Sequence, residues 1–288
     1  MPTTRHFGTR GTSGRTTFKD SSVGCPTLRH RGHPRATVPA GVLIAGLVIG
    51  VFVAVVTTPV LASASTSNGE IAEFSTGLSP QSVVGNMVTG PDGEQWFTEF
   101  GTAAIGEIGS SGAITQFLTG LRTQSALGSI VEGSDGNLWF TDDGPSPAIG
   151  EITPSGTITE YSSGLNTGSF PNEMVSGPDG SLWFTDSGTT PAIGQITPSG
   201  TITEYTNGLA VGSLPNNIVT GPNGNLWFTD NGTTPAIGQV VLSGAITEYS
   251  NGLHGGSFPN QIGTGSGGSL WFTDVGLDTA IGQVSIGS

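Results

Sequence analysis

The sequence is poor in cysteine and, beyond its first 35 residues, in basic side chains. Its single cysteine is Cys25, so a fold stabilised by internal disulfides is excluded. Seven of the eight Lys and Arg residues lie at or before Arg35, and only Arg122 follows. The chain after Ala64 holds 20 of the 21 Asp and Glu residues. This excess of negative charge repels phosphate backbones, and we expect no nucleic-acid partner.

The residue sets of several enzyme classes are also missing. There is no Ser-His-acid set, no cysteine nucleophile after Cys25 and no glycine-rich loop between a strand and a helix. His254 is the only histidine after residue 33. A hydrolase or a nucleotide-binding protein is therefore disfavoured.

One long apolar run stands near the beginning of the chain. No charged residue occurs between Arg35 and Glu70, and residues 41–56 are almost entirely apolar. Ala62-Ser63-Ala64 follows as a small-residue cleavage pattern, so residues 38–64 are expected to be a signal peptide or a membrane anchor. Residues 1–37 are expected to be a disordered basic leader. In either case the protein is secreted, or extracytoplasmic and anchored, and this segment alone meets the membrane.

Glycine and tryptophan, in contrast, recur at fixed positions. The 48 glycines fall in turns between short apolar runs, and all five tryptophans belong to a repeated Leu-Trp-Phe-Thr-Asp pattern. They are Trp96, Trp139, Trp183, Trp227 and Trp271, at spacings of 43 and 44 residues. A period near 44 residues indicates one repeated supersecondary unit.

Each repeat predicts four short strands, as residues 201–205, 217–220, 225–229 and 236–240 illustrate. The third of these is apolar on both faces, which is typical of a strand covered on both sides. The first is more polar and suits an outer edge. We therefore predict an all-β fold, a single β-propeller of five four-stranded blades over residues 68–288.

The two ends of the repeat region complement each other. Residues 281–288 stop where a repeat would next supply its Ile-Thr-Glu-Tyr strand, and Glu70-Ile71-Ala72-Glu73-Phe74 supplies a similar strand near the other end. We expect this N-terminal strand to close the last blade and the protein to be a monomer.

The repeat resembles that of the virginiamycin B lyase (streptogramin lyase) family. Residues 216–230 carry the resemblance as Asn-Asn-Ile-Val-Thr-Gly-Pro-Asn-Gly-Asn-Leu-Trp-Phe-Thr-Asp, followed by Ile237-Gly238, and it extends over about residues 70–288. The resemblance implies a seven-bladed propeller that opens the ester ring of type B streptogramins by elimination, with Mg²⁺ and an essential histidine base. Five repeats are present in this chain.

The family's histidine stands fourteen positions before an acid that ends the central strand. We expect the two positions to face each other across a hairpin, near one mouth of the central channel. The matching pairs in this chain are Gly85 with Glu99, Gly128 with Asp142, Asn172 with Asp186, Asn216 with Asp230, and Asn260 with Asp274. None of them contains histidine, and an asparagine amide cannot act as a general base.

The candidate sites each have a structural alternative. The five acids of these pairs could bind Mg²⁺ or Ca²⁺, or could accept hydrogen bonds from nearby turns. Asn172, Asn216, Asn260 and the loop residue Arg122 are candidate ligand-binding residues, although the asparagines could equally cap turns. His254 is the remaining candidate base, with a solvated loop side chain as its alternative.

The sequence therefore favours a noncatalytic module that binds a small molecule, a peptide or a protein at one mouth of the propeller. A C–O lyase acting on a cyclic ester antibiotic with Mg²⁺ is the second hypothesis, and the family resemblance supports it. A purely structural surface protein is the third.

Overall fold

A computed structural model describes residues 69–286 of the chain. The described residues all belong to one compact unit of the chain. The leader predicted at residues 1–37 and the apolar segment predicted at residues 38–64 lie outside the described residues. Within residues 69–286, the structure has no helix with the length and apolar character needed to cross a membrane.

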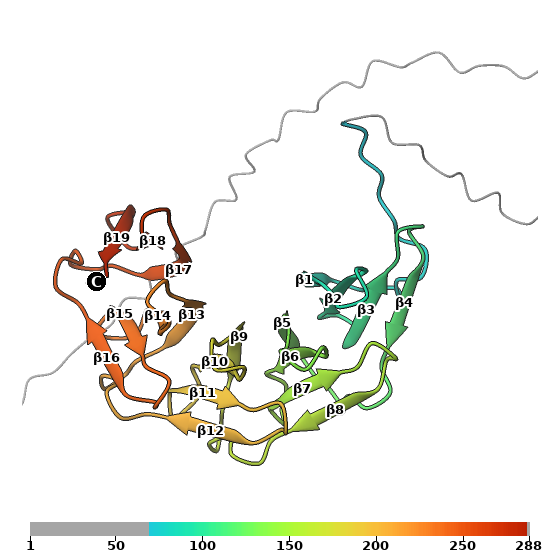
Figure 1. Cartoon of the computed structure of the whole chain (residues 1–288), viewed down its shortest axis with the longest axis horizontal. Helices are drawn as coiled ribbons and strands as arrows, with labels where there is room; N and C mark the ends of the chain where they lie inside the picture. Colours follow the sequence, from blue (N-terminus) through green and yellow to red (C-terminus); the bar gives the residue numbers. More distant parts are fainter. Residues whose placement is uncertain (1–68, 287–288) are drawn as a thin grey trace, which may run out of the picture. The chain divides into compact units, whose positions relative to one another are not determined.

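The described residues form five antiparallel sheets, which we call blades 1 to 5 (Figure 1). The strands of blades 1 to 3 are β1 (Val84–Thr89), β2 (Gln95–Glu99), β3 (Ala104–Ile108), β4 (Ile114–Phe117), β5 (Leu127–Glu132), β6 (Leu138–Asp142), β7 (Ala148–Ile152), β8 (Ile158–Tyr161), β9 (Pro171–Ser176), β10 (Leu182–Asp186), β11 (Ala192–Ile196) and β12 (Ile202–Tyr205). Those of blades 4 and 5 are β13 (Pro215–Thr220), β14 (Leu226–Asp230), β15 (Ala236–Val240), β16 (Ile246–Tyr249), β17 (Pro259–Thr264), β18 (Ser269–Asp274) and β19 (Ala280–Ser285).

The predicted blade core is confirmed by the second strand of blades 1 to 4. Every residue of β10 is buried. Its neighbours Trp183 and Phe184 belong to two different hydrophobic clusters, because consecutive side chains of a strand point to opposite faces. The ring of Phe184 lies on Gly194, where an added Cβ would come within 2.0 Å of it. The repeated Ile-Gly of the third strand thus makes room for this ring.

The predicted outer edge is also confirmed. The sheet of blade 3 has the order β12-β11-β10-β9, which places the Ile-Thr-Glu-Tyr strand at one edge. Tyr205 of this strand stacks on Trp183 with 5.7 Å between ring centroids. The indole N–H of Trp183 donates to Asp179 in the hairpin turn at 3.3 Å. Blades 1, 2 and 4 repeat the ring stacking.

The prediction that the N-terminal strand closes the last blade is wrong for this structure. Blade 5 contains only β17, β18 and β19, and residues 70–74 form no strand. Phe74 instead lies against Gly112 of blade 1, as Tyr161 lies against Gly200 of blade 3. The segment thus occupies the place of an outer strand that would precede blade 1. The blades follow one another in an arc (Figure 1). The two ends of the arc, blade 1 and blade 5, remain apart (Figure 1).

Candidate functional site

We call the first strand of each blade its inner strand; these strands are β1, β5, β9, β13 and β17. Each inner strand carries a β-bulge near its start. In blade 3, Asp186 pairs with Pro171. Two residues, Asn172 and Glu173, then stand opposite the single Thr185, because the register shifts there. The other four blades show the same shift. The prediction that position 172 faces position 186 is therefore wrong. The bulge adds one residue to the inner strand, so Pro171 and not Asn172 pairs with Asp186.

In blades 1 to 4, a buried threonine fixes the bulge to the next blade. The Thr185 hydroxyl accepts the backbone N–H of Glu173 at 3.3 Å and donates to the backbone oxygen of Asn216 in blade 4 at 2.6 Å. The equivalent donors are Thr98 to Gly128, Thr141 to Asn172, and Thr229 to Asn260. The inner strands are thereby held in one register around the channel.

The bulges place polar side chains around a pocket of about 200 Å³. All five inner strands contribute to it. In each blade, the position matched to the family histidine is followed by a residue that lines the pocket. We call these five residues the inner ring. They are Asn86, Ser129, Glu173, Asn217 and Gln261. Sequence reasoning missed this ring, although a polar residue at one position of every repeat was a visible signal.

The asparagines predicted as ligand-binding residues lie beside the inner ring. Asn172 and Asn216 line the pocket. The Asn216 side-chain amide donates to the side-chain oxygen of Asn260 at 3.0 Å, and that of Asn172 donates to the Ser187 hydroxyl at 2.7 Å. The Asn216 amide thus connects blades 4 and 5, and the Asn172 amide also donates to the backbone oxygen of Pro215 in blade 4 at 3.5 Å.

Glu173 is the only ionisable residue of the inner ring. Its carboxylate accepts the Ser129 hydroxyl at 3.1 Å. Burial raises the pKa of Glu173, although the hydrogen bond from Ser129 opposes this effect. Asp143 also lines the pocket, and its pKa is raised by burial and by the charge of Asp142. The pocket thus combines amides and hydroxyls with two acids that bind their protons more tightly than usual.

The acids predicted as a metal-binding ring are buried within the blades. The Oδ1 atom of Asp186 accepts the backbone N–H of Phe170 at 2.8 Å and that of Gly188 at 2.7 Å. Asp142, Asp230 and Asp274 accept two equivalent N–H groups each. Glu99 instead accepts side-chain donors, of which Gln116 is one, at 2.6 Å. These contacts match the alternative in which the acids hold the turns.

These acids do not converge on a common point. Among residues 69–286, no group of three or more His, Cys, Asp or Glu side chains is placed to hold a metal ion. The donor set expected for Mg²⁺ or Ca²⁺ is therefore not assembled, and the described residues do not fit the magnesium ion that the family resemblance implies.

A second acid, on the outer strand, faces three of these aspartates. Burial and a hydrogen bond to Asp186 raise the pKa of Glu204 to about 8. Burial raises the pKa of Glu248 and that of Glu160 to about 7, with Asp230 and Asp142 as their respective partners. The Oδ2 atoms of the three aspartates are buried without a hydrogen-bond donor. Below these pKa values a proton on each glutamate supplies that donor, and each pair can then share one proton.

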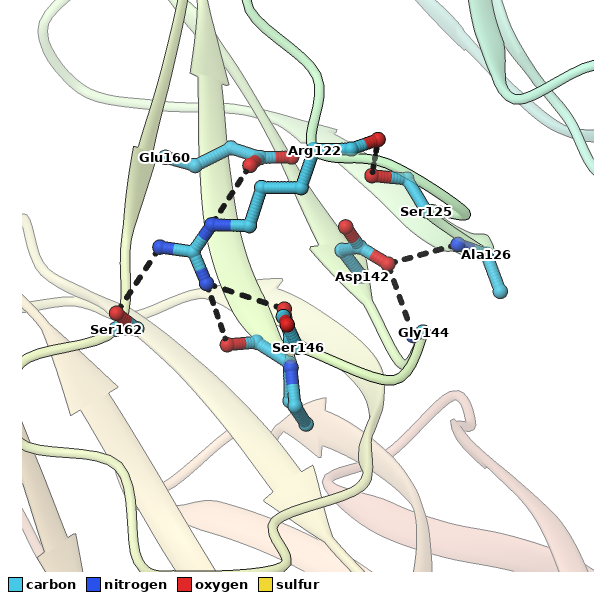
Figure 2. Close-up of polar contacts among 9 residues, drawn as sticks. Arg122, Ser125, Ala126, Asp142, Gly144, Ser146, Glu160 and Ser162 are labelled. Carbon is cyan, nitrogen blue, oxygen red and sulfur yellow. Dashed lines mark hydrogen bonds and ion pairs between the residues drawn. The ribbon is translucent and has the colours of Figure 1, made fainter.

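Arg122 is engaged within its own blade (Figure 2). Its Nε atom lies 3.1 Å from a carboxylate oxygen of Glu160. The guanidinium also donates to the backbone oxygens of Ser146 and Pro147 and to the Ser162 hydroxyl, at 3.0–3.1 Å. These contacts use most of its donors, so the geometry gives no support to Arg122 as a ligand-binding residue.

His254 lies in the exposed loop before β17 and does not line the inner-strand pocket. Its charge acts on Asp274. Burial acts to raise the pKa of Asp274, but hydrogen bonds from the backbone N–H groups of Phe258 and Gly276 and the charge of His254 lower it. The structure therefore separates His254 from the asparagines of the pocket.

Solved structures of enzymes resemble the chain. The virginiamycin B lyase from Staphylococcus aureus is 34% identical with a TM-score of 0.61, over 72% of this chain and 71% of that one. A catalytically inactive histidine-to-alanine variant of that enzyme, solved with quinupristin, is 34% identical with a TM-score of 0.60, over 69% of each chain. A streptogramin B lyase is 30% identical with a TM-score of 0.61, over 73% of this chain and 71% of that one.

No curated protein matches the chain. A family profile, however, agrees with the solved structures. The profile of the Virginiamycin B lyase family matches residues 50–210 and residues 189–288, which together include every blade. The chain therefore belongs to the virginiamycin B lyase family.

Proposed function

We propose that this protein is a noncatalytic binding propeller that acts outside the cytoplasmic membrane and takes a polar ligand into the inner-strand pocket. The observation that supports the proposal is the chemistry of the pocket. Side-chain amides and hydroxyls from all five inner strands meet there, and no histidine lies among them. The pocket has donors and acceptors for a ligand but lacks the base of the family reaction.

The pocket indicates what kind of ligand it fits. An amide both donates and accepts hydrogen bonds, so Asn172, Asn216 and Asn217 match the alternating N–H and C=O groups of a peptide ring. A volume of about 200 Å³ accommodates one residue-sized group and leaves the rest of a larger ligand at the mouth. A solved relative contains quinupristin, which makes this compound the natural probe.

Binding of quinupristin tests the proposal. In isothermal titration calorimetry, we expect the wild-type protein to bind it, and Asn172→Ala and Asn216→Ala each to bind about 5- to 10-fold more weakly. Each variant loses about 1–1.5 kcal/mol, the contribution of one hydrogen bond to the ligand.

Asn225→Ala is the matched control, because Asn225 lies in a hairpin turn and does not line the pocket. Its affinity should equal that of the wild type. Equal affinities for all four proteins, or no binding at millimolar quinupristin, would contradict the proposal.

A C–O lyase remains the second candidate because one acid of the pocket could accept a proton. Burial raises the pKa of Glu173 toward the range in which a carboxylate is a useful general base. In this alternative Glu173 removes a proton from the carbon next to the one that bears the ester oxygen, the C–O bond breaks, a C=C bond forms and the carboxylate leaves as the new chain end, while the amides around it hold the ring.

Liquid chromatography with tandem mass spectrometry separates the two candidates, because ring opening by elimination leaves the mass of the compound unchanged and the linear isomer is recognised by its retention time and fragments. We expect wild-type protein incubated with quinupristin and Mg²⁺ to leave the compound cyclic. A linear product that Glu173→Gln abolishes would establish the lyase with Glu173 as its base. A product lost only in His254→Ala would assign the base to His254, and either result would overturn the noncatalytic proposal.

A further inference from the structure

One interface joins the blades and recurs four times in the chain. At each junction, a tryptophan and an isoleucine of one blade pack against apolar side chains of the next. In the junction of blades 3 and 4, Trp183 and Ile193 meet Ile218, Phe228 and other apolar residues. We call the first side the tryptophan face and the second side the receiving face.

Among residues 69–286, no side chain covers the tryptophan face of blade 5. Trp271 is 43% exposed, whereas Trp96, Trp139, Trp183 and Trp227 are at most 3% exposed. Ile281 of the same face is 67% exposed, whereas its counterpart Ile237 in blade 4 is 2% exposed. Leaving these side chains in water forgoes the burial that every other blade obtains.

The receiving face of blade 1 is partly uncovered in the described part of the chain. Met87 is 55% exposed, although the residue at the same position in blade 3, Met174, is 2% exposed. Val84 beside it is 44% exposed. The two ends of the arc are thus the two halves of the interface that already joins the other blades.

The edge strand of blade 5 also lacks a partner strand. A cavity of about 530 Å³ lies beside it, lined by Trp227 and Ile237 of blade 4 and by β19. In the preceding junction, Ile246 of the outer strand β16 packs in the cluster around Trp183 and is 8% exposed. The cavity therefore lies where the isoleucine of an outer strand would pack.

Residues 70–74 have the side chains that this place requires. The outer strands β8, β12 and β16 read Ile-Thr-Glu-Tyr, and Ile71-Ala72-Glu73-Phe74 has the same spacing. Ile71 is 88% exposed and Phe74 is 49% exposed. In the register of blade 4, Ile71 would pair with Val284 and Phe74 with Ile281.

The segment of the same chain is held elsewhere. Phe74 lies on Gly112, and an added Cβ at Gly77 would come within 2.8 Å of the backbone of Ile114. Phe74 and Gly77 therefore both lie against blade 1. Blades 1 and 5 stand at opposite ends of the arc (Figure 1). A second chain, however, can bring this segment and the receiving face of its blade 1 to β19 together.

We propose that two copies of this chain associate head to tail, with residues 70–74 of one copy added as the fourth strand of blade 5 of the other. The strand completes the β19 edge, Ile71 enters the cavity and Phe74 stacks on Trp271. Met87 then covers the tryptophan face. The contact is heterologous, because each copy offers a different surface at each end. The predicted monomer depended on self-closure, which the structure does not show.

Two charge substitutions test the two ends separately. Ile281→Glu disables the blade 5 end and Met87→Glu disables the blade 1 end. Both side chains are exposed in a single copy, so both variants should fold with the wild-type circular dichroism spectrum. The full chain is kept in a mild nonionic detergent at about 0.15 M salt, which screens the acidic surface, and its mass is measured by analytical ultracentrifugation. Any association through residues 1–64 would be the same in the wild type and in both variants, so it would not affect their comparison.

We expect the wild type to form a concentration-dependent assembly. For each variant alone, the dissociation constant of the assembly should rise at least 10-fold. An equimolar mixture of the two variants should recover a complex of two chains, because one intact end remains on each. Val211→Glu, a change of the same kind at a 95% exposed position away from both ends, should behave as the wild type.

Three results would overturn the proposal. A wild-type mass equal to that of the Ile281→Glu variant at all concentrations would mean that the ends stay free or close on themselves. Loss of association in only one variant would mean a symmetric contact between like ends. Failure of the mixed variants to associate would exclude the head-to-tail arrangement.

Discussion

Asp186→Ala should lower the free energy of unfolding by about 3–5 kcal/mol. The substitution removes the acceptor of the backbone N–H groups of Phe170 and Gly188, at 2.8 and 2.7 Å, in a place where water cannot replace it. Each hydrogen bond to a charged group contributes about 1.5–3 kcal/mol, and Glu204 also loses its partner. For a folded unit of this size, the melting temperature should fall by about 10 °C in a thermal scan followed by circular dichroism.

Asp278→Ala is the control, because Asp278 is exposed in a loop of blade 5. Its melting temperature should stay within about 1 °C of the wild type. The same scans distinguish a structural acid from a metal ligand. A cation bound at 100 times its Kd would add about 2.7 kcal/mol to the stability. We expect millimolar Mg²⁺ or Ca²⁺ to leave the wild-type melting temperature unchanged, and a rise that Asp186→Ala abolishes would refute the structural role.

The repeat and its core could be predicted from the sequence because each depends on local pattern. A fixed spacing of the tryptophans implies one repeated unit, and three consecutive apolar residues imply a strand covered on both faces. The polar outer strand followed from the same reasoning. Asn172 and Asn216 line the pocket and Asn260 accepts a hydrogen bond from Asn216, because equivalent positions of a repeat lie side by side on neighbouring blades.

The remainder depends on contacts that no single repeat contains. The bulge opposite Thr185 is fixed by a hydrogen bond to the next blade, so a simple hairpin count places Asn172 one residue away from its true partner. The partnership of Glu204 with Asp186 requires the fold of the whole blade. The failure to close depends on the angle between blades, which the five-fold repeat does not reveal.

Raising the pH from 5 to 9 should lower the melting temperature by about 6–12 °C. In the folded state burial raises the pKa of Glu204 to about 8, well above the ordinary value of about 4.5, so folding favours the protonated form. The stability from this group is fully present below pH 4.5 and is lost as the pH rises through 8. Because these glutamates are half-buried, solvent screening limits each to about 1 kcal/mol, or about 3 kcal/mol for the three pairs.

Combining Glu204→Gln with Glu248→Gln should flatten this profile. A glutamine amide donates a hydrogen bond to an acid at any pH, and blade 1 already uses this solution, because Gln116 donates to Glu99 at 2.6 Å. The double variant should match the wild type at pH 5 and melt about 5 °C higher at pH 9, since two of the three pairs no longer lose a proton. Glu132→Gln, at an exposed position of β5, should follow the wild type at both pH values. Equal destabilisation of the double variant at pH 5 and pH 9 would mean that the paired acids do not share a proton.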